Sequence, residues 1–165
     1  MSIELIVLDV DGTMTDGKII YTEQGDEIKS FCVKDGLAIA SWVKLGKKVA
    51  IITGRSSNIV KRRAGELGID YLYQGVHNKK EVLTKLLLEL GLELENVASI
   101  GDDLNDFPML TSSKISFAPY NASSYILNIV DIKLKNSGGE GAVREMIEKL
   151  ITQEGLEEAY LELWQ

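Results

Sequence analysis

The sequence contains few of the residues on which several protein classes depend. Its 165 residues include one cysteine, Cys32, and one histidine, His77. A single cysteine excludes a disulfide within the chain and suits a reducing compartment, so we expect the protein to be cytoplasmic. One histidine without a second cannot build the usual kind of zinc site, and we expect His77 to be an ordinary loop residue.

The chain also lacks long apolar runs and an excess of positive charge. No run is long enough to span a bilayer, and no secretory leader pattern is visible, which argues against a membrane partner. The formal net charge of −7 argues against nucleic acid as a general partner. A small anionic ligand is still compatible, because the local field of a site can oppose the net charge. With 45% hydrophobic and 26% charged residues, we expect one globular domain over residues 1–165.

The first apolar run ends in two carboxylates. Residues 5–8 (Leu-Ile-Val-Leu) have the composition of a buried strand, and residues 9–13 (Asp-Val-Asp-Gly-Thr) follow at once. Alternation along an extended chain places Asp9 and Asp11 on the same side. Buried acids are costly unless a cation or strong donors satisfy them, which indicates a functional site. The alternative is that the pair merely caps the next turn, because Asp and Gly are common turn residues.

Apolar spacing along the rest of the chain predicts strands that alternate with helices. The expected strands are residues 48–53, 69–73, 97–100, 114–118 and 129–134. The expected helices are residues 35–45, with Asp35 as N-cap, and residues 57–67, 78–90 and 142–153. This alternation indicates a three-layer α/β/α fold with a doubly wound, mainly parallel sheet. Two further β-type runs around a glycine-containing turn predict a hairpin flap at about residues 18–33.

Chemically capable side chains follow three of the predicted strands. They are Asp9, Asp11, Thr53, Asp102 and Asp103. Ligands gather at the carboxyl ends of strands in such sheets, so we expect these side chains to converge. Several carboxylates in one small space need a cation, and an all-oxygen set suits Mg²⁺ before Ca²⁺. Because Mg²⁺ is usually shared with a substrate phosphate, a phosphate ligand is implied as well.

The same edge offers groups that could hold this phosphate. Thr53 supplies a hydroxyl, and the backbone amides of residues 54–56 (Gly-Arg-Ser) stand at a helix start, where anions bind. Lys79, just before another helix, adds a positive charge. A carboxylate nucleophile, a second carboxylate, a cation and these donors are the parts that phosphoryl transfer needs. A covalent aspartyl-phosphate would split a very slow hydrolysis into two easier steps.

These motifs resemble those of a known superfamily. Residues 9–13, Thr53, Lys79 and residues 101–106 look like the four motifs of the haloacid-dehalogenase-like phosphohydrolases, in order. The resemblance is closer still to the capless 3-deoxy-D-manno-octulosonate 8-phosphate phosphatases and extends over residues 3 to about 150. The motifs that carry it are Asp11-Gly12-x-x-Thr15-Asp16-Gly17, Lys34-Asp35-Gly36, Ile52-Thr53-Gly54-Arg55, Tyr73-Gln74-Gly75, Gly101-Asp102-Asp103 and Gly138-Gly139-x-Gly141-Ala142-x-Arg144-Glu145.

The resemblance implies a role for each residue of the site. Asp9 is the nucleophile, and Asp11 is the general acid that later acts as the base for water. Mg²⁺ binds Asp9, the backbone carbonyl of Asp11, and Asp102. Thr53 and Lys79 hold the phosphoryl group. The remaining candidates are Gly54, Arg55 and Arg144 for substrate binding, and Asp103 and Asp106 for support of the metal ligands.

Some of these candidates also have an ordinary structural explanation. Asp103 could be a helix N-cap, and Arg55 could pair with a surface acid. Lys79 stands beside Lys80, and either lysine could be solvated at the helix start.

The resemblance implies that the substrate is 3-deoxy-D-manno-octulosonate 8-phosphate, a sugar-acid phosphate of lipopolysaccharide precursor synthesis. The sequence departs from the family pattern at Leu37-Ala38, where a second glycine is usual. It departs again at residues 118–121 (Ala-Pro-Tyr-Asn), where Val-Ala-Asp-Ala is more typical. Neither departure touches the catalytic residues, but both could border the sugar. A nine-carbon, sialic-acid-type 9-phosphate is therefore the alternative substrate.

Two other function classes are also considered. A phospho-receiver signalling domain shares the clustered aspartates, the threonine and the lysine. The strand that ends at Thr53, however, carries no aspartate for a receiver to phosphorylate. An inactive binding module is the third alternative, although no motif position has been lost.

The chain has no room for an inserted cap domain. Residues 18–52 can hold only the hairpin and one helix, and residues 54–78 only one helix and one strand. A monomer's site would be open to water, and the resemblance implies a homotetramer with the hairpin in the interface. The apolar side chains of the hairpin, Ile19, Tyr21, Ile28 and Phe31, agree with this. We expect the apolar tail, residues 155–165, to dock on another subunit rather than fold back on its own domain.

Overall fold

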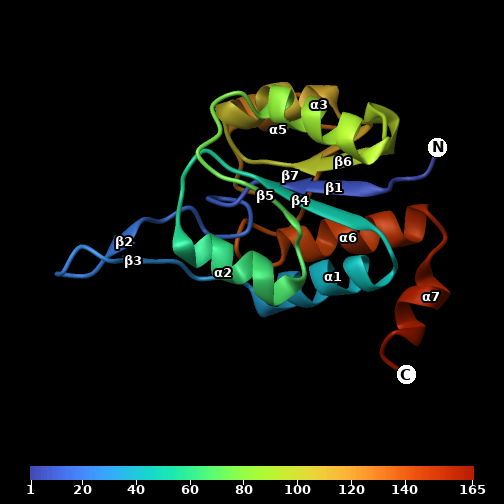
Figure 1. The fold of residues 1–165 in the computed structure, drawn as a ribbon, viewed down its shortest axis with the longest axis horizontal. Coiled ribbons are helices and arrows are strands. Elements are labelled where there is room, and N and C mark those ends of the chain that lie inside the picture. The colour runs from blue at the N-terminus through green and yellow to red at the C-terminus, as the bar shows by residue number, and fades with distance from the viewer.

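The computed structural model describes residues 1–165, and a six-stranded sheet forms its centre (Figure 1). The strands are β1 (Leu5–Leu8), β4 (Lys48–Ile52), β5 (Tyr71–Tyr73), β6 (Val97–Ile100), β7 (Ile115–Ala118) and β8 (Ile132–Lys133). Their order is β5-β4-β1-β6-β7-β8, and every neighbouring pair is parallel. The expected doubly wound α/β architecture is confirmed, and this sheet is parallel throughout.

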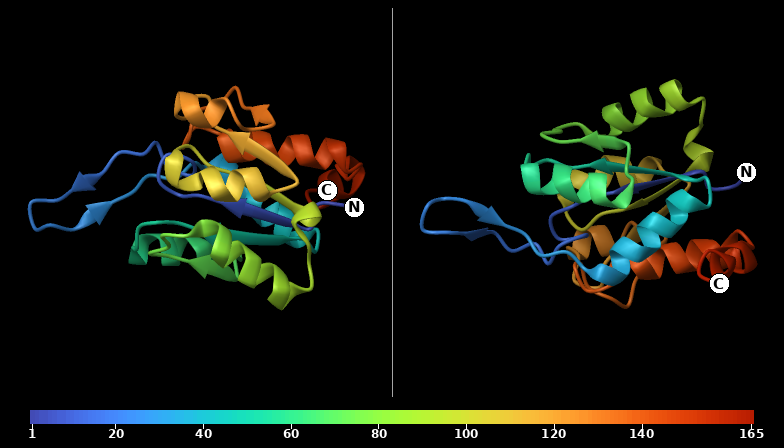
Figure 2. Two further views of the ribbon diagram at one scale, coloured as in Figure 1. Left: turned by 90° about the horizontal axis from the view of Figure 1, so that it is seen from above. Right: turned by 60° about the horizontal axis from the view of Figure 1, so that its bottom comes forward.

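Helices cover both faces of the sheet (Figure 2). On one face lie α1 (Val33–Lys44), α2 (Asn58–Leu67) and α6 (Ala142–Gln153). On the other lie α3 (Lys79–Leu90), α4 (Phe107–Ser112) and α5 (Ser124–Leu127). Two short 3₁₀ helices, η1 (Leu94–Asn96) and η2 (Leu104–Asp106), precede and follow β6. No helix combines the length and apolarity needed to cross a membrane.

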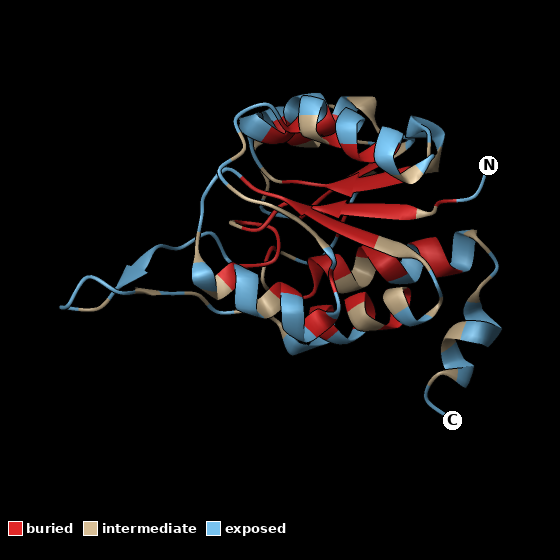
Figure 3. Cartoon of the chain, viewed as in Figure 1, coloured by how far each residue is buried: buried red, intermediate tan, exposed pale blue.

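β1 is buried on both faces, which explains why its sequence is a continuous apolar run. Leu5 and Val7 join the core beneath α3, α4 and α5, whereas Ile6 and Leu8 join the larger core beneath α1, α2 and α6. All four side chains are fully buried (Figure 3). Burying an aliphatic side chain of this size contributes about 1.5–3 kcal/mol. The buried strand therefore fixes the position of the chain just before the two carboxylates that follow it.

Two helix ends match the sequence pattern, and one helix start does not. α2 ends before Gly68 and α3 before Gly91, as expected. α1 begins earlier than expected, with Cys32 as its N-cap, so the prediction that Asp35 caps this helix is wrong. Asp35 Oδ1 instead accepts a 2.9 Å hydrogen bond from the backbone N–H of Arg144, in the first turn of α6. Because α6 has no side-chain cap of its own, Asp35 serves as its cap from a different helix.

The hairpin is present, but its strands are short. β2 (Ile20–Tyr21) and β3 (Glu27–Ile28) pair antiparallel and project from the carboxyl edge of the sheet (Figure 1). The large apolar side chains exposed along it are Ile19, Ile20, Tyr21 and Ile28. Between β1 and β4 the chain forms only this hairpin and α1, and between β4 and α3 only α2 and β5. No cap domain is inserted, as expected.

The C-terminal helix packs on its own domain. α7 (Glu157–Glu162) lies at the end of the molecule opposite to the hairpin (Figures 1 and 2). Leu156 and Tyr160 pack against the larger core, and Lys44 Nζ lies 4.6 Å from the centre of the Trp164 ring. Part of residues 155–165 therefore folds back onto the chain's own domain, while Leu161 and Trp164 remain 58% and 50% exposed. The expected docking of this tail on another subunit stays a prediction.

Candidate active site

The carboxyl ends of β1, β4 and β6 meet around one polar pocket of about 180 Å³. Its lining residues are Asp9, Asp11, Thr53, Gly54, Arg55, Asp102, Asp103 and Asn105. Seven of these eight were candidates from the sequence. No apolar side chain lines the pocket, so it suits a small, strongly polar ligand.

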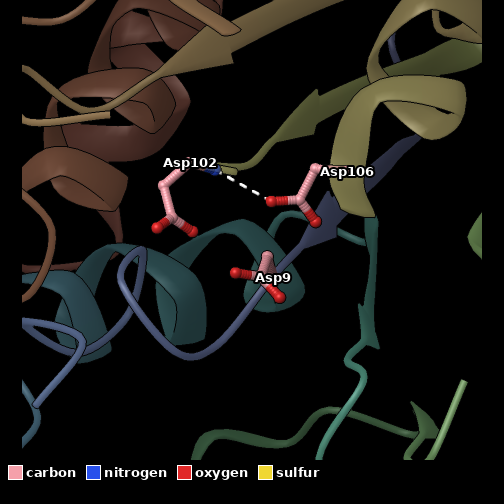
Figure 4. Close-up of side chains that lie close together, drawn as sticks. All are labelled: Asp9, Asp102 and Asp106. Carbon is pink, nitrogen blue, oxygen red and sulfur yellow. Dashed lines mark hydrogen bonds between the residues drawn. The ribbon is translucent and has the colours of Figure 1, made fainter. Parts of the chain in front are cut away.

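Three buried or half-buried carboxylates lie together beneath this pocket. Asp9 follows β1, Asp102 follows β6, and Asp106 ends η2 (Figure 4). One oxygen from each lies within 4.8 Å of the others, which is close enough to share a metal ion. The carboxyl edge of the sheet therefore brings together acids from two separated segments of the chain.

Lys79 joins two of these acids. Its ammonium donates hydrogen bonds to Asp9 Oδ1 at 2.7 Å and to Asp106 Oδ1 at 2.5 Å, and its side chain is 0% exposed. Asp106 Oδ2 accepts from the backbone N–H groups of Asp102 at 2.9 Å and Asp103 at 3.2 Å. Both carboxylate oxygens of Asp106 thus accept hydrogen bonds, Oδ1 from Lys79 and Oδ2 from the backbone of residues 102–103. Asp9 and Asp102 are the two carboxylates left to bind a cation.

Burial shifts the ionisation of the whole cluster. It raises the pKa of Asp9 to about 7 and the pKa values of Asp102 and Asp106 to about 6. Burial alone would lower the pKa of Lys79, but the carboxylates of Asp9 and Asp106 outweigh it and leave this pKa raised. One lysine charge cannot satisfy three carboxylates, so the cluster needs further positive charge to ionise fully.

The loop after β1 is shaped around Asp102. Gly12 has a φ of +92°, and a Cβ atom there would lie 2.0 Å from Asp102 Oδ2, so only glycine fits. Thr13 Oγ1 donates to Asp102 Oδ1 at 3.1 Å. The carboxylates of Asp9 and Asp102 offer oxygen donors close together at this place. Hard oxygen donors of this kind are the ligands that Mg²⁺ prefers, so the residues fit that ion.

Asp11 is tied to the hairpin, which the sequence did not predict. Its Oδ1 accepts a 2.5 Å hydrogen bond from Lys29 Nζ, and Lys29 also pairs with Glu27 at 3.1 Å. Glu27 Oε1 in turn accepts from the Arg55 guanidinium at 2.9 Å, while Arg55 Nε lies 4.0 Å from Asp11 Oδ2. Lys29 and Glu27 were not among our candidates.

The other side of the pocket is formed by the end of β4. Thr53 is buried, and its position is fixed because its backbone N–H donates to the carbonyl of Tyr73 at 3.0 Å and its carbonyl accepts from Val76 at 3.0 Å. Gly54 and Arg55 follow at the pocket wall. Asn105 also lines the pocket and was missed, although it stands inside the fourth sequence motif.

Two candidates have clear local roles in this chain. Asp103 caps η2, with its Oδ1 accepting from the N–H of Leu104 at 2.8 Å, although it also lines the pocket. Arg144 does not line the pocket: its guanidinium donates to Glu148 at 2.5 Å and to the carbonyl of Lys34 at 3.2 Å. The structure therefore brings together all the candidates except Arg144.

The comparisons with known proteins agree with this geometry. Residues 71–147 match the family described as haloacid dehalogenase-like hydrolase. The chain is 41% identical over 159 residues to a 3-deoxy-D-manno-octulosonate 8-phosphate phosphatase of Escherichia coli (strain K12), covering 96% of this chain and 85% of that one.

Two solved structures are also similar. The crystal structure of the 3-deoxy-D-manno-octulosonate 8-phosphate phosphatase from Moraxella catarrhalis, in complex with a magnesium ion, a phosphate ion and a KDO molecule, is 39% identical. It matches with a TM-score of 0.95 and covers 99% of this chain and 94% of that chain. The cobalt-bound phosphatase from Haemophilus influenzae is 38% identical, with a TM-score of 0.89 and coverage of 93% and 90%.

Proposed function

Because this chain belongs to the 3-deoxy-D-manno-octulosonate 8-phosphate phosphatase family of the haloacid dehalogenase-like hydrolases, we infer that it hydrolyses this sugar phosphate with Mg²⁺ as cofactor. The products are 3-deoxy-D-manno-octulosonate and inorganic phosphate. The observation that carries the inference is one pocket in which Asp9, Asp11 and Asp102 meet beside the buried ammonium of Lys79. The similar proteins named above are phosphatases, which favours hydrolysis over the phospho-receiver and inactive-module alternatives.

The first chemical step transfers the phosphoryl group to the protein. A carboxylate oxygen of Asp9 forms a bond to phosphorus while the bond from phosphorus to the sugar oxygen breaks. Asp11 gives its proton to that leaving oxygen. Lys79 holds Asp9 in place through its 2.7 Å hydrogen bond and offsets negative charge beside the phosphorus. The result is an aspartyl-phosphate on Asp9 and the free sugar acid.

The second step releases phosphate. The Asp11 carboxylate takes a proton from a water molecule, the water oxygen bonds to phosphorus, and the bond from phosphorus to Asp9 breaks. Asp9 and Asp11 are thereby returned to their starting states. Mg²⁺, held by Asp9, Asp102 and the backbone carbonyl of Asp11, supplies positive charge that offsets the charge of the phosphoryl group.

The remaining site residues complete the proposal. Thr53, Lys79 and the backbone amide of Gly54 hold the phosphoryl group, and the side chain of Arg55 binds the carboxylate or hydroxyls of the sugar acid. Asp106 supports the site by holding Lys79 and the loop after β6. Asp103 supports the same loop as the cap of η2. Arg144 does not line this pocket, so a role in substrate binding would have to be played at the site of a neighbouring subunit.

The proposal extends to the assembly and location of the protein. Each subunit is one domain over residues 1–165, and four subunits associate through their hairpins, whose apolar side chains are exposed. In the tetramer, adjacent subunits would border each active site, which otherwise lies open to water because the chain has no inserted cap domain. A cytoplasmic location is supported by the single cysteine, Cys32.

The test is phosphate release from a panel of esters with Mg²⁺. The eight-carbon sugar-acid 8-phosphate should give the highest kcat/KM, and a higher value for a nine-carbon sialic-acid-type 9-phosphate would select that alternative. Asp9→Asn should abolish turnover, because an amide cannot attack phosphorus. Activity that survives Asp9→Asn, or a wild-type protein that hydrolyses none of the esters, would overturn the proposal.

A further inference from the structure

Lys29 has a buried side chain, although it stands on a largely exposed hairpin. It directly follows β3, yet its side chain is 1% exposed, whereas Ile28 beside it is 47% exposed. Removing an ammonium from water is costly unless it is fully paired. Lys29 is paired by two carboxylates, with its Nζ 2.5 Å from Asp11 Oδ1 and 3.1 Å from Glu27 Oε1. Through this side chain the hairpin therefore contacts Asp11, which lines the pocket.

We propose that Lys29 is a positioning residue that holds the Asp11 carboxyl in the orientation needed for proton transfer to and from the substrate. The inference rests on the proposed function, in which Asp11 moves the proton. Lys29 does not line the pocket, so it acts through the side chains that it contacts, Asp11 directly and Arg55 by way of Glu27. It follows that the hairpin is part of the catalytic apparatus as well as a surface for association.

The geometry around Asp11 shows how the orientation is set. Lys29 engages Oδ1, so rotation of the carboxyl would break a short charged hydrogen bond. The other oxygen, Oδ2, lies on the side of Arg55, whose Nε is 4.0 Å away, beyond hydrogen-bonding distance. Arg55 is kept at that distance by its 2.9 Å hydrogen bond to Glu27. Oδ2 is thus the oxygen left to exchange a proton at the pocket.

The choice of ester separates positioning from a merely structural role. An alkoxide leaving from a sugar phosphate needs a proton, whereas the weakly basic nitrophenolate of p-nitrophenyl phosphate does not. The value of kcat/KM reports the steps up to cleavage of the ester bond, and therefore excludes the later use of Asp11 as a base. A misplaced Asp11 should lower kcat/KM for the sugar phosphate and spare it for the nitrophenyl ester.

The experiment measures kcat/KM for both esters in Lys29→Met, with Lys18→Met as the matched control. Lys18 is an exposed lysine at the base of the same hairpin whose side chain makes no ion pair. General acid catalysis contributes about 10²–10⁴-fold, so Lys29→Met should lose at least about 10-fold more on the sugar phosphate than on the nitrophenyl ester. Lys29→Arg keeps the charge and should recover most of the difference. Lys18→Met should match the wild type on both esters.

Equal losses on both esters in Lys29→Met would overturn the proposal and leave Lys29 as a structural contact of the hairpin. Should Lys29→Met fail to fold in a thermal unfolding assay, Lys29→Gln, which keeps a polar donor, takes its place with the same criterion. Asp11→Asn separates this inference from the proposed function. If Asp11→Asn loses kcat/KM equally on both esters, the proposed acid role of Asp11 is wrong. If Asp11→Asn loses more on the sugar phosphate but Lys29→Met loses equally on both, only the present inference is wrong.

Discussion

Lys79 Nζ lies 2.7 Å from Asp9 Oδ1, although the two residues are 70 positions apart in the sequence. The side chains are 0% and 6% exposed, and the same ammonium contacts Asp106 at 2.5 Å. A lysine that the sequence alone could have left solvated at a helix start is therefore enclosed between two acids. Its charge is the counter-charge of two buried carboxylates.

Replacing Lys79 should destabilise the protein strongly. In Lys79→Met two buried carboxylates lose their counter-charge, and breaking a buried pair costs about 3–5 kcal/mol. We expect a decrease of this size in the free energy of unfolding, measured by urea denaturation near pH 8. Adding Asp106→Asn should restore part of the loss, because it removes one of the unpaired charges. A double variant less stable than Lys79→Met would contradict this explanation.

Stability without metal should fall as the pH rises. The pKa of Asp9 is raised from its usual 3.8 to about 7, so between about pH 4 and pH 7 the folded chain holds protons that the unfolded chain releases. The free energy of unfolding then decreases across this range, and Asp102 and Asp106, with pKa values of about 6, act in the same direction. Urea denaturation in the presence of a chelator checks this sign.

Mg²⁺ should restore stability over the same pH range. The ion binds ionised carboxylates, so the increase in Tm on adding Mg²⁺ should be larger near pH 8 than near pH 5. Asp102→Asn is the control, because it should reduce the increase at the higher pH. An increase in Tm that is equal at both pH values would show that Mg²⁺ binding does not compete with protons at this cluster.

Gly12→Ala should weaken the metal site specifically. The new Cβ atom would lie 2.0 Å from Asp102 Oδ2, which must then move. Loss of a group that merely orients a ligand typically costs about 10–100-fold in metal affinity. Because Asp102 is itself a proposed ligand, we expect a loss of at least this size by Mg²⁺ titration. Gly46→Ala is the matched control, because its φ of +82° imposes similar strain, of about 1–2 kcal/mol, with no atom within 4 Å of the new Cβ. It should lower stability and spare Mg²⁺ affinity.

The hairpin should control association. Tyr21→Ser and Ile28→Ser remove apolar surface that is 62% and 47% exposed on the single chain. If four subunits associate through the hairpins, these variants should sediment as smaller species than the wild type. Leu88→Ser provides the control, since Leu88 is 80% exposed on α3, away from the hairpin. A wild-type chain that stays monomeric at all concentrations would refute the tetramer.

The sequence predicted the sheet well because its signals are local. Buried runs such as residues 5–8 and 97–100 end in acids, and the end of a parallel strand fixes where those acids must lie. Strand identity was therefore enough to bring Asp9 and Asp102 together. The glycines after α2 and α3 marked their ends in the same local way.

The sequence was silent where a contact depends on how separate elements pack. Asp35 looked like the cap of its own helix, yet it caps α6, 109 positions away. Lys29 was not a candidate, because nothing local in the sequence shows that its side chain contacts Asp11, 18 positions away. Arg144 belonged to a recognisable motif, but its guanidinium lies on Glu148, one helical turn further along α6.

The central position of β1 has a consequence for folding. Its neighbours β4 and β6 come from distant parts of the chain. The site also depends on contacts between distant residues, such as the hydrogen bond from Thr13 to Asp102, 89 positions apart. Isolated helices can form in about a microsecond, whereas parallel pairing over such separations is slow. Intermediates that contain only α3 or α6 would have no pocket. The return of activity after dilution from denaturant should thus follow completion of the sheet, and lag behind the recovery of helical signal.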